Sequence, residues 1–129
     1  MIRIPVVLEF SPQRISDLVV SAVEGGSNYW SHIKIFDGQG NRLRGLDAAG
    51  PNGCCGKCRV VFKDLQDQSY YGELNLLSEG KMENVAGGGL TRMAGKYPTH
   101  FADFLAENDD ATTADVFVQC CIFGEVRYG

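Results

Sequence analysis

Three of the five cysteines in this chain lie within residues 52–60, whose sequence is NGCCGKCRV. Cys55 and Cys58 form a CxxC pair, and thiolates at this spacing bind zinc or iron–sulfur clusters. A plant-type 2Fe–2S loop also needs a cysteine ahead of this pair and a fourth one downstream. The position six residues before Cys55 is Ala49, and Cys54 is too close in sequence to Cys55 to replace that ligand easily. We therefore expect no iron–sulfur cluster.

Zinc binding and thiol redox chemistry are the other uses of a CxxC pair. Further zinc ligands would have to come from the remaining cysteines and histidines, which form no second ligand pair: Cys120, Cys121, His32 and His100. A redox CxxC opens a helix after a strand, whereas this one precedes RVVF, which is typical of a strand. We expect no metal and no cofactor. A small metal- or redox-binding protein that uses Cys55 and Cys58 remains the alternative.

Catalytic motifs are not found in the sequence. His100 has Asp103 three positions further on, a spacing at which a carboxylate can orient an imidazole on a helix. However, the chain contains no GxSxG, no HExxH and no phosphate-binding GxxxxGK[ST]. A capping or packing role explains His100 better than a catalytic role does. The sequence thus predicts a protein that is not an enzyme.

The stretch EGGSNYW, residues 24–30, contains the only tryptophan. Glycines allow a ligand to approach the backbone, and Tyr and Trp supply rigid rings with polar tips. We predict a binding site formed by Gly25, Gly26, Ser27, Asn28, Tyr29 and Trp30. Arginines nearby in sequence are the candidates for contacting phosphates: Arg42, Arg44 and Arg59. A Trp30 that seals the core beneath a helix end is the competing interpretation.

Charge is distributed unevenly along the chain. The net charge is −4, with +2 over residues 1–64 and −6 over residues 65–129. An acidic half disfavours nonspecific nucleic-acid binding, which needs several cations on one face, and we expect no direct nucleic-acid partner. These carboxylates either form a solvated surface and favour helix starts, or present an acidic face to a basic partner. The residues of that face would be Asp103, Glu107, Asp109, Asp110 and Asp115.

Length and composition predict one domain spanning residues 1–129, because 44% hydrophobic and 22% charged residues are typical of a folded chain of this size. No apolar run approaches the roughly 18 residues of a membrane-spanning helix, and no signal sequence is recognisable at the N-terminus. Five cysteines, in an odd number with two adjacent pairs, indicate reduced thiols. We therefore expect a cytoplasmic protein without a membrane partner.

The pattern of the first half predicts strands around one helix. Residues 2–10 are rich in β-branched side chains and predict a strand, which Pro5 would place at an edge. Ser11 and Pro12 then begin an amphipathic helix that Gly25 and Gly26 end. Further strands are expected at 32–36, 59–63 and 70–76, the last two forming a hairpin. Residues 37–57 are predicted to be a long loop.

The second half predicts helices. Ser78 caps the first, in which Gly87, Gly88 and Gly89 imply either a break or close packing of another backbone. Lys96-Tyr97-Pro98 ends it, and Thr99 caps a short helix. The last helix begins within 108–113 and is apolar almost all round, which predicts burial in a core or in a homo-oligomer interface. This order gives an α+β fold with a small, largely antiparallel sheet.

Two segments resemble a family of small proteins encoded by tailed bacteriophages. They are ISDLVVSAVEGGSNYW, residues 15–30, and KYPTHFADFLAENDDATTADVFVQCCIFGEVRYG, residues 96–129, together about 50 of 129 residues. The middle of the chain, with its cysteines, departs from the family. The resemblance implies a phage setting, the host cytoplasm and an accessory rather than a virion role. It implies no particular activity or catalytic residues.

The combined expectation is a phage accessory protein that antagonises a bacterial defence system by binding. One form is an anti-CRISPR-like inhibitor, in which the acidic residues face the nucleic-acid groove of a Cas protein or complex. The other is a sponge for a nucleotide second messenger, in which a base stacks on Tyr29 or Trp30 while arginines hold the phosphates.

Overall fold

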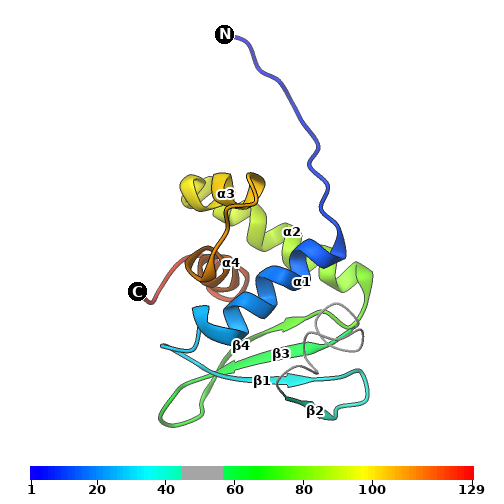
Figure 1. The fold of residues 1–129 in the computed structure, drawn as a ribbon, viewed down its shortest axis with the longest axis vertical. Coiled ribbons are helices and arrows are strands. Elements are labelled where there is room, and N and C mark those ends of the chain that lie inside the picture. The colour runs from blue at the N-terminus through cyan, green and yellow to red at the C-terminus, as the bar shows by residue number, and fades with distance from the viewer. Residues whose placement is uncertain (45–56) are drawn as a thin grey trace.

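The computed structural model of this chain describes residues 1–44 and 57–129. These residues form an α+β fold with a four-stranded antiparallel sheet, as the sequence predicts. The elements follow the order α1 (Pro12–Ser21), η1 (Ala22–Gly26), β1 (His32–Phe36), β2 (Arg42–Leu43), β3 (Arg59–Lys63), β4 (Tyr70–Asn75), α2 (Glu79–Lys96), α3 (Pro98–Leu105) and α4 (Ala111–Phe123) (Figure 1).

The sheet has the strand order β2-β1-β3-β4, and the helices pack over one of its faces (Figure 1). Ile35, Val60 and Leu74 lie side by side in the register of β1, β3 and β4, and all three belong to the core. Because successive side chains of a strand point to opposite faces, the next row, Lys34–Val61–Glu73, lies on the other side. We call this second side the outer sheet face.

Helix α1 begins as the sequence predicts. The Ser11 hydroxyl accepts a hydrogen bond from the Arg14 amide, and Pro12 is the first helical residue. The helical backbone ends at Gly25 and Gly26, as predicted, but its last turn is not α-helical. After Ser21 the backbone widens into one π-helical turn, η1, which includes Gly25 and Gly26. Such turns are rare and often occur at functional sites.

Helix α2 continues without a break through its three consecutive glycines. A Cβ atom at Gly89 would collide with Cys121 Sγ and come within 3.2 Å of the Phe117 ring. The predicted break is therefore absent, and close packing is realised at Gly89 alone, against side chains of α4 rather than another backbone; Gly87 meets nothing within 4 Å. The absent side chain lets α2 lie directly against α4.

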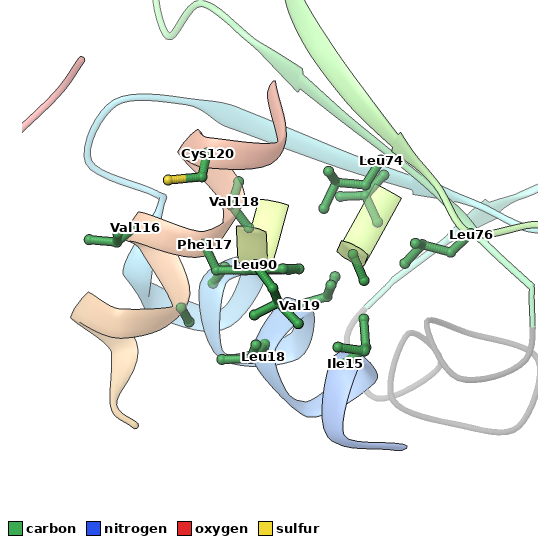
Figure 2. Close-up of a cluster of buried hydrophobic side chains, with 14 of the residues drawn as sticks. Ile15, Leu18, Val19, Leu74, Leu76, Leu90, Val116, Phe117, Val118 and Cys120 are labelled. Atoms are coloured by element: carbon green, nitrogen blue, oxygen red, sulfur yellow. The ribbon is translucent and has the colours of Figure 1, made fainter. Parts of the chain in front are cut away.

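Helix α4 lies at the centre of the fold. The Asp110 carboxylate caps its start, and Gly124 ends it in the left-handed region with φ 79°. Residues 113–120 are all buried, against α1, η1, α2, α3 and β4. Figure 2 shows side chains of α1, α4 and β4 meeting in this core. The apolar circumference of α4, from which a homo-oligomer was expected, is thus covered within one chain.

Three sequence predictions are wrong in detail. Residues 2–10 are extended but unpaired, so they form no strand; β-branched side chains favour this backbone, yet a strand needs a neighbour. The predicted loop 37–57 contains a turn at residues 37–41 and the short strand β2, while its residues 45–56 lie outside the described part. Helix α3 starts at Pro98 with Tyr97 before it, not with Thr99 as its cap.

Among the described residues, no helix is both long enough and apolar enough to cross a membrane.

The two glycines of η1 provide a matched test of this packing. A Cβ atom at Gly26 would collide with the carbonyl oxygen of Ala111, whereas one at Gly25 meets nothing within 4 Å. We expect Gly26→Ala to lower the free energy of unfolding by about 1–3 kcal/mol, since backbone cannot move aside cheaply. Gly25→Ala should change it by no more than about 1 kcal/mol. Urea unfolding of both variants measures the difference, and equal effects would contradict the close approach of η1 to α4.

Candidate functional site

The stretch 24–30 and helix α4 meet at one buried carboxylate, that of Asp115, which is 5% exposed. Its Oδ1 accepts hydrogen bonds from Ser27 Oγ and Trp30 Nε1, both at 2.7 Å. Its Oδ2 accepts from Tyr29 OH at 2.7 Å and from Gln119 Nε2 at 3.0 Å. Two carboxylate oxygens offer about four acceptor positions. The four donors therefore satisfy Asp115 with protein groups.

Gln119 extends this network to the C-terminal segment. Its Oε1 accepts from the backbone amides of Arg127 and Tyr128 at 2.8 and 3.0 Å. Its Nε2 also lies 3.1 Å from the carbonyl oxygen of Tyr128, which is 2.9 Å from Tyr29 OH. Burial, followed by the hydrogen bond to Asp115, raises the pKa of Tyr29 to about 12. Tyr29 is therefore protonated at neutral pH and serves as a donor.

Trp30 belongs to the core, and the prediction that a ligand base stacks on it is wrong. The side chain is 5% exposed. Its ring stacks on Phe62 with centroids 5.7 Å apart and on Tyr128 with centroids 5.1 Å apart. The indole N–H is satisfied by Asp115. A residue whose ring and polar tip both find partners inside the protein has no surface left for a ligand.

A pocket of about 500 Å³ lies beside the Asp115 network, and it brings together part of the predicted binding site. Gly25, Gly26 and Tyr29 line it, as do His100 and Asp115. His100 Nδ1 lies 3.3 Å from Thr113 Oγ1 at the start of α4, which fits the packing role expected for this histidine.

The other two residues of the predicted stretch lie apart from the walls described for this pocket. Ser27 is buried beneath the turn that follows η1, and Asn28 is exposed on it.

Two of the predicted phosphate-binding arginines, Arg42 and Arg59, lie on the outer sheet face, across the sheet from the core. Arg42 is exposed and pairs in register with Phe36, which in turn pairs with Arg59. The Arg59 guanidinium carbon lies 5.2 Å from the centre of the Phe36 ring. Arg44 is exposed just after β2. Trp30 packs on Phe62 of the opposite, core face, so the arginines and Trp30 cannot hold one ligand.

Phe36 is the aromatic residue that sequence reasoning missed. The strand HIKIF alternates, with Ile33 and Ile35 on the core side and Lys34 and Phe36 on the other. This alternation was the available signal, because it places Phe36 on the polar face of its strand. The rest of that face carries further charge: Lys34, Lys63 and Glu73.

Glu73 is engaged by its neighbours on the outer sheet face. Its Oε1 lies 3.5 Å from Arg59 Nη1 and accepts from Tyr70 OH at 3.0 Å. Tyr70 is 59% exposed and provides a second aromatic ring on this side.

The five predicted acidic contact residues do not form one exposed face. Asp115 is buried, and Asp109 pairs with Arg14 at 3.3 Å. Asp110 caps α4, and the hydrogen bond that its carboxylate accepts from the Thr113 amide lowers its pKa. Asp103 is half-buried in α3, and Glu107 is exposed after it. The carboxylates that begin α4 thus stabilise the helix start, which was the alternative interpretation of this cluster.

The cysteines that the structure describes are inside the fold. Cys58 is fully buried, and Cys55 lies outside the described residues. Burial raises the pKa of Cys120 to about 11 and also raises that of Cys121 above the ordinary value. Because the thiolate is the metal ligand and the nucleophile, the cysteines of α4 are held in their unreactive form.

Replacement of Asp115 tests the network directly. Asp115→Asn turns one acceptor oxygen into a donor amide that faces other donors, so we expect the free energy of unfolding to fall by about 3 kcal/mol. Asp17→Asn, at an exposed position of α1, should change it by less than about 0.5 kcal/mol. Urea unfolding followed by Trp30 fluorescence reports both. A stable Asp115→Asn protein would contradict the role given to this carboxylate.

Comparisons with known proteins do not assign the site, since no protein-family model, curated protein or solved structure matches this chain.

Proposed function

We propose that this protein is a phage accessory protein that antagonises a bacterial defence system by binding a nucleotide signal on the outer sheet face. The observation that carries the proposal is the Arg59 guanidinium over the Phe36 ring at 5.2 Å. A flat cation–aromatic pair of this kind is a platform on which a base stacks. The same face supplies cations for phosphates from Lys34, Arg42 and Lys63.

Charge supports this choice of surface. The strands contribute four cations and one carboxylate to the outer sheet face, in a chain whose net charge is −4. The carboxylate, Glu73, already accepts from Tyr70 and lies beside Arg59. The face is therefore locally positive, which attracts a phosphate-bearing ligand and raises the rate of its association.

The cation–aromatic pair is partly accessible and rigidly held. The Arg59 side chain is 39% exposed, so a base can stack on its outer side while Phe36 supports it from below. Phe36 and Arg59 sit on paired strands, which hold their relative positions better than a loop does. The protein would retain its ligand in the host cytoplasm without changing it chemically and so lower the free concentration of the signal.

The anti-CRISPR-like form of the hypothesis has less support. Three of its five acidic residues, Asp109, Asp110 and Asp115, bind groups of the protein itself. Asp103 and Glu107 remain as candidates for contacting a Cas protein. That form predicts that Glu107→Lys abolishes inhibition of the Cas complex, and that variants of the outer sheet face do not.

The metal or redox alternative depends on Cys55 and Cys58. Metal analysis of the purified protein tests it: one zinc or iron per chain, lost in Cys55→Ser, would favour it over nucleotide binding.

Calorimetric titration with cyclic dinucleotides and linear oligoadenylates tests nucleotide binding. Phe36→Ala and Arg59→Ala should each weaken binding by about 10-fold or more, because a stacked base contributes roughly 1–3 kcal/mol. Lys81→Ala removes an exposed cation on α2 and serves as the matched control, with unchanged affinity expected. The ligand should be recovered intact from the complex. Absence of binding, equal loss in the control variant, or turnover of the nucleotide would contradict the proposal.

A further inference from the structure

The first nine residues form an extended segment that projects from the fold, and we call it the N-terminal arm. Its large apolar side chains are exposed, with Ile2 at 90%, Ile4 at 77% and Val6 at 70%. Figure 1 shows the arm leaving the start of α1 and pointing away from the sheet and the helices. At its base, Phe10 packs on Phe104 with ring centroids 4.8 Å apart. The arm thus has a fixed root and an uncovered apolar surface.

The two charged side chains of the arm, Arg3 and Glu9, occupy odd positions. Its even positions are all apolar, from Ile2 to Leu8, and Met1, Pro5 and Val7 are apolar as well. On an extended backbone the even side chains lie on one side. A contiguous exposed apolar row is unusual for a folded protein and marks a contact surface.

A groove of about 480 Å³ lies next to the root of the arm, between the start of α1 and α2. Its apolar lining comes from Ile15, Met82 and Leu90, among others. Its carboxylates come from Glu79 and Glu83 of α2, together with Glu9 of the arm itself. The groove therefore combines an apolar floor with acidic edges.

We propose that the N-terminal arm of one copy of this chain occupies the groove of a second copy, and that the exchange is reciprocal. The apolar even positions match the apolar floor, and Arg3 matches the carboxylates of Glu79 and Glu83. Opposite charge beside an apolar contact fixes register as well as affinity. The arrangement also covers the apolar row that a single copy exposes.

The arm is better placed to occupy the groove of a second copy than the groove of its own chain. Leu8 and Phe10 already line the groove of their own chain, so the arm would have to reverse direction immediately before them. Pro5 is the only turn-favouring residue in residues 1–10, and Val6 and Val7 after it are β-branched and fit extended backbone. Because root and groove are adjacent, two copies related by a two-fold axis can exchange arms and close the assembly.

Sedimentation equilibrium of the full chain tests the exchange. We expect a dimer for the unaltered protein and about a 10-fold or larger increase in the dimer dissociation constant for Ile4→Asp. Leu65→Asp, at an exposed apolar position of the β3–β4 loop, is the matched control and should remain dimeric. Circular dichroism should show an unchanged fold for both variants. A monomeric unaltered protein, or a dimer that Ile4→Asp leaves intact, would overturn the proposal.

A charge exchange tests the pairing itself. Arg3→Glu and Glu83→Lys should each weaken the dimer, and the double variant should recover most of the loss, because the opposite charges are restored in reverse order. Losses that simply add in the double variant would assign the dimer to another surface. Neither Arg3 nor Glu83 lies on the outer sheet face, so these variants should keep their nucleotide affinity. Nucleotide titration therefore tests the proposed function separately from the dimer.

Discussion

The fold depends on the buried carboxylate of Asp115. A carboxylate removed from water is unfavourable unless hydrogen bonds replace its hydration. Here four side-chain donors do so, from the turn after η1 and from the next turn of α4. These donors therefore allow the Asp115 side of α4 to be buried without loss of hydrogen bonds. In the described part of the chain, no buried side-chain nitrogen or oxygen lacks a partner.

This network joins two segments that lie far apart in the sequence. Residues 15–30 supply the donors Ser27, Tyr29 and Trp30, and residues 96–129 supply Asp115 and Gln119. Segments distant in sequence thus form one polar centre beneath the C-terminal segment. These polar and aromatic residues are of the types found in binding sites, but here they connect α4 to the turn after η1. The proposal for nucleotide binding accordingly rests on the outer sheet face.

Much of the fold was predictable because local physics decides it. Ser11 and Pro12 mark the start of α1 and Ser78 that of α2, and both serine side chains cap their helices as expected. The position of Trp30 was not predictable from its neighbours, since burial depends on Asp115, 85 positions away. Continuity of α2 through Gly89 likewise depends on Cys121, which approaches it from another helix.

Two further predictions fail because they depend on pairing between strands. The arm is not a strand, and the ring beside the arginines is Phe36 rather than Trp30. The arm was predicted to be a strand because its side chains favour extended backbone, but strand formation also requires a paired neighbour. Among the predicted site residues, Arg42 and Arg59 do lie together on one face. Their aromatic partner is Phe36, which the alternation of β1 indicates. The register of β1 against β3, which long-range pairing sets, determines that Arg59 lies over that ring.

The central claim is that Trp30 and its neighbours hold the core together while the outer sheet face binds the ligand. The most direct measurement is an amide and indole NMR titration with the tightest-binding nucleotide. The account predicts shifts at Lys34, Phe36 and Arg59, with the Trp30 indole N–H resonance unmoved and slow to exchange with solvent. A Trp30 indole resonance that exchanges rapidly and shifts with the ligand, while the strand amides stay unchanged, would contradict it.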